Sequence, residues 1–267
     1  MNTFKRLTTL TMMLAASMSV MADKPTHDIY QESYALYVLY HPDNKSQSTQ
    51  ALTNQYSQDY TALFKQSKQV NLDQFVDYEQ ARITDLMKQR RDMSLKQTYV
   101  RYGILDADKN QKMTLKEFQA SGMRTFDEVD KNKDGLISEE DIKLASHDGS
   151  THDGFKVRLP ISMPMANGAA EFIKQYGQGK AYTTLGDYLV ARDQQFAETD
   201  VNKDLIVTEQ EYVNEFMQRY DQNTVKGIEK MKEISQRQFQ AIAKNKNTIS
   251  EKDIAKFAKD LDKKISQ

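Results

Sequence analysis

The sequence predicts an all-α protein in which tandem helix–loop–helix units follow an N-terminal helical region. Apolar residues recur at helical spacing through most of the chain. One segment, Phe126–Ile142, recurs several times, with apolar residues at both ends and polar residues between them. One long stretch, residues 147–168, contains several Gly and Pro residues and is expected to be irregular.

Residues 1–22 are typical of a secretory signal peptide. Lys5 and Arg6 precede an apolar stretch, and cleavage is expected after Ala22. An uncleaved membrane anchor is the alternative, but the stretch is shorter than the roughly 20 apolar residues of a spanning helix. The chain has no Cys, so neither a disulfide framework nor a lipid-modified cysteine is expected. We therefore expect a periplasmic or secreted protein without a membrane span.

The charge balance argues against a nucleic-acid partner. Removal of residues 1–22 takes away two basic residues, which leaves 35 basic against 38 acidic residues and a net charge of −3. The charges alternate along the chain, as on solvated helix faces, and do not form a basic stripe.

Several helices can be assigned from local signals. Pro42 is expected to end a first helix over residues 27–40, and Ser94 to cap the helix that enters the first loop. Three apolar stripes predict buried helix faces: Leu52, Tyr56, Tyr60, Leu63 and Phe64; Leu72, Phe75, Val76, Ile83, Leu86 and Met87; and Ile254, Phe257, Ala258, Leu261 and Ile265.

The recurring segment has three clear copies besides Phe126–Ile142, namely Tyr102–Phe118, Phe196–Tyr212 and the shorter Phe239–Ile254. A degenerate fifth copy, Tyr176–Asp187, keeps only Thr184 and Asp187. The copies predict a first lobe (93–146) and a second lobe (169–267), joined by a linker (147–168). The signal peptide (1–22) and an N-terminal helical region (23–92) precede them.

The polar residues of the repeat have the spacing of a calcium loop. Such a loop of 12 residues needs side-chain oxygens at its first, third, fifth and ninth places, a backbone carbonyl at the seventh and a carboxylate at the twelfth. Gly135 stands at the sharp turn of the segment. Every ligand place of residues 130–141 is filled, by Asp130, Asn132, Asp134, the carbonyl of Leu136, Ser138 and Asp141.

These residues resemble the EF-hand family of calcium-binding proteins, in particular bacterial secreted members with closely spaced EF-hand pairs. The resemblance implies Ca²⁺ as the cofactor and very short β bridges between paired loops. It assigns two further ligand sets: Asp106, Asp108, Asn110, the carbonyl of Lys112, Thr114 and Glu117; and Asp200, Asn202, Asp204, the carbonyl of Ile206, Thr208 and Glu211.

Three departures from the family pattern have physical consequences. Gln111 and Leu205 replace the turn glycine, where φ > 0 is expected and a side chain costs on the order of 1 kcal/mol. Asp141 replaces the usual glutamate and is one methylene shorter, which favours six-coordination and makes Mg²⁺ possible there. The fourth copy should bind no metal, because Ala243 replaces the first aspartate and Lys244 and Lys246 add positive charge.

The sequence thus predicts a calcium sensor or buffer. The alternative is an envelope adaptor in which residues 23–92 and the linker engage an unidentified protein partner while calcium is structural. An enzyme is not expected, because the chain has no Cys, four His and no serine nucleophile motif. His147 and His152 leave open a transition-metal site in the linker, against a simple polar hinge.

Overall fold

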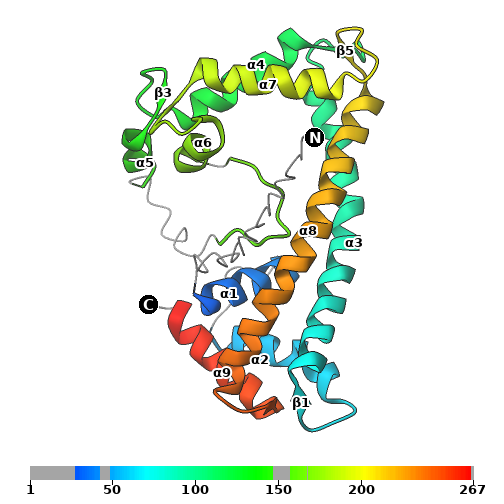
Figure 1. The fold of residues 1–267 in the computed structure, drawn as a ribbon, viewed down its shortest axis with the longest axis vertical. Coiled ribbons are helices and arrows are strands. Elements are labelled where there is room, and N and C mark those ends of the chain that lie inside the picture. Colours follow the sequence, from blue (N-terminus) through cyan, green and yellow to red (C-terminus); the bar gives the residue numbers. More distant parts are fainter. Residues whose placement is uncertain (1–27, 43–48, 147–156, 167, 266–267) are drawn as a thin grey trace, which may run out of the picture.

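The computed structural model describes residues 28–42, 49–146, 157–166 and 168–265 (Figure 1). The predicted signal peptide and the linker histidines lie outside these residues.

The prediction of an all-α protein is confirmed. Within the described residues, nine α-helices and one 3₁₀ helix are joined by loops that contain only two-residue strands. The α-helices are α1 (Ile29–Tyr40), α2 (Thr49–Asp59), α3 (Leu72–Leu105), α4 (Leu115–Val129), α5 (Glu139–Ser146), α6 (Ala169–Tyr176), α7 (Leu185–Thr199), α8 (Glu209–Ala243) and α9 (Glu251–Ile265). The 3₁₀ helix η2 is Thr61–Phe64, and the strands are β1 (Val70–Asn71), β2 (Met113–Thr114), β3 (Leu136–Ile137), β4 (Thr183–Thr184), β5 (Ile206–Val207) and β6 (Thr248–Ile249).

The strands pair in a nested order. The antiparallel pairs are β1 with β6, β2 with β5, and β3 with β4. Each strand before the linker therefore pairs with a strand after it. The partners of β1, β2 and β3 follow in reverse order along the chain, as β6, β5 and β4. The division into two lobes at residues 147–168 does not describe this pairing, because every strand pair joins the two sides of that division.

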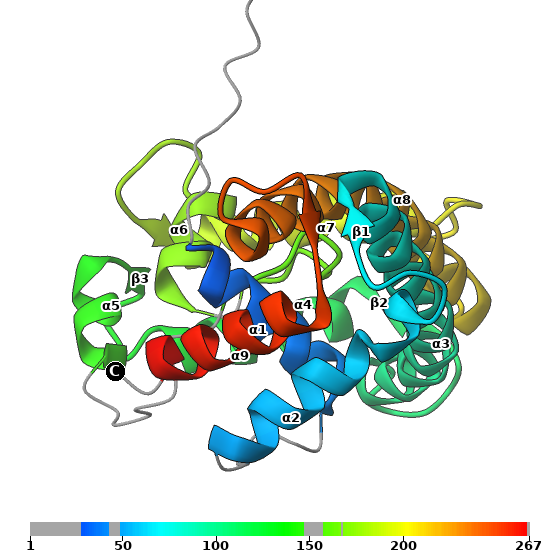
Figure 2. The ribbon, with the colours of Figure 1, turned by 90° about the horizontal axis from the view of Figure 1, so that it is seen from below.

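The helices between these pairs form two ends joined by a long stem. Helices α3 and α8 lie side by side as the stem, and α4 lies beside α7 at one end (Figure 1). At the other end, α1, α2 and α9 pack together on one side of the stem (Figure 2). We call the end with α4–α7 the loop end and the end with α1, α2, α9 and the β1–β6 pair the base.

The expected cap at Ser94 is wrong, because α3 continues through it. Residues 72–102 contain neither Gly nor Pro, so nothing interrupts the helix. The helix is capped earlier, where the Asn71 side chain accepts the N–H of Gln74 at 3.0 Å. The predicted boundary between residues 92 and 93 therefore lies inside one continuous helix.

The core consists of four apolar clusters spaced along the molecule. The predicted first helix and the apolar stripes occur as expected: α1 begins after Asp28 and ends before Pro42, and Phe75, Ile83 and Phe257 are fully buried. Two clusters lie in the base and stem, and one lies beneath each of the strand pairs β2–β5 and β3–β4.

Part of the predicted linker belongs to the core. Leu159 and Ile161 are buried in the stem cluster, and the side-chain amide of Asn223 donates to the carbonyl of Ser162 at 3.3 Å. The backbone of this segment passes so close to α8 that a Cβ on Gly227 would lie 2.7 Å from the Cα of Ile161. The segment therefore fastens the loop end to the stem.

Candidate functional site

Three loops at the loop end share one backbone conformation. We call them the Asp106 loop (residues 106–117), the Asp130 loop (130–141) and the Asp200 loop (200–211). The sixth residue of each has positive φ, at 63° for Gln111, 83° for Gly135 and 68° for Leu205. The prediction of positive φ at the two non-glycine turns is therefore confirmed. The fourth residue of each loop also has positive φ: Lys109, Lys133 and Lys203.

The first aspartate of each loop is buried and turned into the loop. Asp106, Asp130 and Asp200 are 3%, 3% and 4% exposed. In each, Oδ2 accepts the N–H of the sixth residue at 2.9 Å. The second oxygen of Asp130, Oδ1, is buried without a hydrogen-bond partner, although a buried carboxylate oxygen normally has one.

The third and fifth places also hold inward-turned oxygens. In all three loops the third side chain accepts the fifth N–H, at 2.9 to 3.1 Å. The fifth side chain accepts the seventh N–H, at 2.8 to 2.9 Å. The residues concerned are Asp108, Asn110 and Lys112; Asn132, Asp134 and Leu136; and Asn202, Asp204 and Ile206.

The closing acid of each loop is held by the loop's own N–H groups. Glu117 accepts the N–H of Thr114 at 2.8 Å, Asp141 that of Ser138 at 2.8 Å, and Glu211 that of Thr208 at 2.9 Å. The ninth-place hydroxyl in turn accepts an N–H from the first turn of the following helix. This capping box positions the closing carboxylate at the start of the helix.

In the Asp106 loop the acids converge on one point. Asp106, Asp108 and Glu117 each place a carboxylate oxygen within 4.8 Å of the others, a group of three that can hold a metal ion. The other two loops also hold three acids, but Asn132 and Asn202 take the third place and the acids Asp134 and Asp204 stand at the fifth. Partial burial acts to raise the pKa of Glu117, but hydrogen bonds, first among them the N–H of Thr114, outweigh it and lower that pKa.

The same hydrogen bond from a ninth-place N–H to the closing carboxylate occurs at two loops that lack the ligand set. We call them the Asp187 loop (residues 176–187) and the Asp253 loop (243–253). Asp187 accepts the N–H of Thr184 at 2.9 Å, and Asp253 accepts that of Ser250 at 2.9 Å. Each of these acids also binds a lysine, which distinguishes it from the three closing acids above.

A sixth loop, before α3, escaped the sequence analysis. Asn71 and Gln74 form its capping box, and its strand β1 pairs with β6. The sequence pattern of the repeat is nevertheless present here. Val70, Asn71 and Phe75 match the apolar, cap and aromatic residues Met113, Thr114 and Phe118 of the first loop. It was overlooked because this loop contains no acids at the ligand places.

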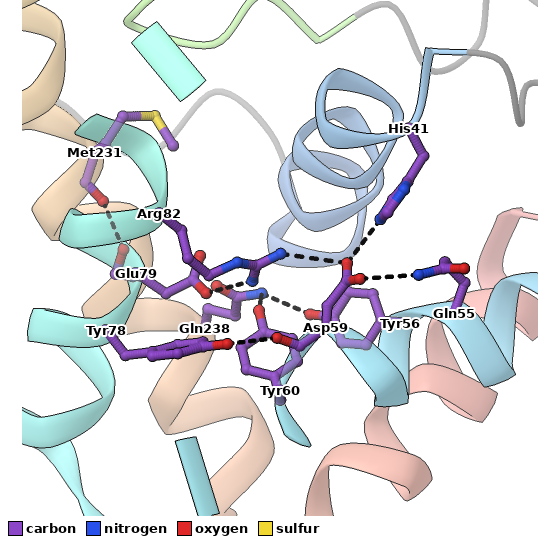
Figure 3. Close-up of polar contacts among 11 residues, drawn as sticks. His41, Gln55, Tyr56, Asp59, Tyr60, Tyr78, Glu79, Arg82, Met231 and Gln238 are labelled. Carbon is purple, nitrogen blue, oxygen red and sulfur yellow. Dashed lines mark hydrogen bonds and ion pairs between the residues drawn. The ribbon is translucent and has the colours of Figure 1, made fainter. Parts of the chain in front are cut away.

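The base contains a second polar cluster, which the sequence also failed to reveal (Figure 3). Arg82 donates to Oε1 of Glu79 at 2.8 Å and to Oδ2 of Asp59 at 3.2 Å. His41 Nε2 lies 2.8 Å from the same oxygen of Asp59, and the Tyr78 hydroxyl donates to the Asp59 carbonyl at 2.6 Å. Burial raises the pKa of the Glu79 carboxyl, while Arg82 acts to lower it.

A cavity of about 10 Å³ adjoins this cluster, which is roughly the space that one water molecule needs. The Ser33 hydroxyl and the Gln238 side-chain carbonyl belong to its lining residues and are buried without a hydrogen-bond partner. The cavity is too small for an organic substrate.

None of the helices in the described ranges has the length and apolar character needed to cross a membrane. Comparison of the chain with models of protein families, with curated proteins and with solved structures finds no match.

Proposed function

We propose that this chain binds Ca²⁺ in three EF-hand loops, the Asp106, Asp130 and Asp200 loops, and serves as a periplasmic or secreted calcium sensor or buffer. The unpartnered Oδ1 of Asp130 carries the proposal. Burial of a carboxylate oxygen without a partner is costly, and a hard divalent cation is the partner that a ring of oxygens favours. Inward-turned oxygens at the matching places of the other two loops support the same role.

The ligands would be the side chains at the first, third, fifth, ninth and twelfth places, together with the seventh carbonyl. A bound cation would neutralise the clustered acids and fix the angle between the helices on either side of each loop. In the Asp130 loop the closing side chain, Asp141, is short and fully buried. This loop is the one that we propose accepts Mg²⁺ as well as Ca²⁺.

The expected affinity follows from the proposed location. The basic and apolar segment at residues 1–22 supports export, and calcium modules outside cells bind with dissociation constants of about 10⁻⁴ to 10⁻³ M. The unfavourable φ of Gln111 and Leu205 is consistent with modest affinity.

Calorimetric titration of the chelator-stripped protein tests the proposal. We expect saturable calcium binding with three ions per chain. Asp130→Asn should remove one ion, whereas Asp127→Asn, which changes an exposed acid outside the ligand places, should leave all three. Absence of saturable calcium heat below about 10 mM would exclude the proposed function.

Tyrosine fluorescence separates a sensor from a buffer. The chain has no Trp, and Tyr102 is a buried reporter whose hydroxyl donates to the carbonyl of Val207, within the Asp200 loop, at 3.2 Å. A change in emission with calcium that magnesium does not reproduce indicates a sensor. Saturable binding with unchanged emission indicates a buffer or a fixed scaffold.

A further inference from the structure

Two loops without the ligand set bind a cation that belongs to the chain itself. In the Asp187 loop, the Lys180 ammonium donates to Oδ2 of Asp187 at 2.5 Å. In the Asp253 loop, the Lys246 ammonium donates to Oδ1 of Asp253 at 2.5 Å. The two contacts lie in different strand pairs, β3–β4 and β1–β6.

Both lysines occupy the same place in their loops. Each stands seven residues before the closing acid. In the three proposed calcium loops, the residue seven before the closing acid is the fifth-place ligand: Asn110, Asp134 and Asp204. The place that supplies an oxygen in the calcium loops therefore supplies an ammonium in the other two.

The closing acids are otherwise held alike. Asp187 accepts both the N–H and the hydroxyl of Thr184, at 2.9 and 2.8 Å. Glu117 accepts the same two groups of Thr114, each at 2.8 Å. What differs is the additional partner of the carboxylate, which for Asp187 is the Lys180 ammonium, bonded to the same oxygen, Oδ2. The sixth loop closes with Gln74, which carries no charge and needs no cation.

We propose that Lys180 and Lys246 are specificity-determining residues that act as tethered cations, hold the Asp187 and Asp253 loops in their closed form and exclude divalent metal from them. The proposal rests on the proposed function of the other three loops. An ammonium already bonded to the closing carboxylate repels a second cation at close range. It also removes the charge that would attract one.

The five loops that close with an acid then differ in their cation according to their strand pair. The β2–β5 pair joins two of the proposed metal-binding loops, the Asp106 and Asp200 loops. The β3–β4 pair joins the third, the Asp130 loop, to the Asp187 loop. The β1–β6 pair joins the Asp253 loop to the sixth loop, which closes with the neutral Gln74. The loops of the β1–β6 pair consequently keep their form without metal. We expect three calcium ions per chain.

Amide hydrogen exchange in the metal-free full chain tests the role of each lysine. Lys180→Met should speed exchange of the Thr184 amide, and Lys246→Met that of the Ser250 amide, by about 10-fold or more because each closing acid loses its cation. Lys180→Arg should keep protection. Lys230→Met is the matched control, since Lys230 is exposed on α8 away from all loops, and it should change neither amide.

Calcium titration of the unmodified chain supplies the second arm. Exchange in Lys180→Met or Lys246→Met equal to that of the control would overturn the tethered-cation role. Binding of more than three calcium ions would overturn the exclusion of metal. Absence of any saturable calcium binding would instead refute the proposed function, and the exchange results in metal-free protein would still decide the role of the lysines.

Discussion

The loop end and the base both bury carboxylates, but they balance the charge differently. At the loop end, the buried acids Asp106, Asp130 and Asp200 form no ion pair with any residue of the described chain. In the base, Arg82 is bonded to both Glu79 and Asp59. The base therefore supplies a cation of its own to its acids, although Oε2 of Glu79 is buried without a hydrogen-bond partner, whereas we propose that the loop end takes up an added cation.

The comparison teaches where metal should act. A ligand stabilises a protein only through the state that it binds, so calcium is expected to order the loop end and leave the base unchanged. The stem connects the two ends, because α3 and α8 each run from the base to the loop end.

Removal of the base's own cation should have the largest effect. Arg82→Met leaves the fully buried Glu79 without its cation, while Asp59 keeps His41 as a partner. Loss of one member of a buried ion pair costs about 3–5 kcal/mol. Arg91→Met is the matched control, because the Arg91–Asp221 pair is about half exposed and such pairs contribute roughly 1 kcal/mol or less. Urea unfolding of the metal-free protein measures both. Equal losses would show that the base does not depend on its internal cation.

The close contact between residues 157–166 and the stem helix α8 should have the next largest effect. Gly227→Ala places a Cβ against the backbone of Ile161, and overpacking of this kind costs about 1–3 kcal/mol. Gly103→Ala, in α3 with no atom close to the added Cβ, should instead stabilise by about 0.5–1 kcal/mol because alanine favours helix. Opposite signs in thermal unfolding confirm the close approach; two stabilised variants would contradict it.

The smallest effect concerns backbone strain in the loops. Leu205 is 77% exposed and has φ of 68°, so Leu205→Gly should stabilise the metal-free protein by up to about 1 kcal/mol by relieving that strain. Val190→Gly is the control, since Val190 is 62% exposed on α7 and glycine there should cost up to about 1 kcal/mol. A destabilised Leu205→Gly would mean that the exposed side chain contributes to folding in another way.

The sequence allowed the helices and the residues of the candidate site to be predicted, because both are encoded locally. Helical periodicity appears in neighbouring turns, and the ligand places lie within twelve residues of one another. The positive φ at Gln111 and Leu205 followed from alignment with Gly135, and the structure agrees.

The order of strand pairing was beyond such reasoning. Two-residue strands such as Met113–Thr114 and Ile206–Val207 are too alike to specify a partner, so the choice depends on how the helices between them pack. The Arg82 cluster was hidden for the same reason. Glu79 and Arg82 are three residues apart and resemble a solvated helix pair. Their burial depends on Asp59 and Tyr60, at the end of α2 and just after it.

The nested strand order has a consequence for how the chain folds. The entropic cost of closing a loop rises with the length of the loop, so the innermost pair, Leu136–Ile137 with Thr183–Thr184, is the cheapest to form first. Once it is joined, each outer pair needs only two intervening helices to come into line, as in a zipper closing outward. Val70 pairs with Ile249 across the longest loop, so we expect the base, which has Arg82 as its own cation, to assemble last.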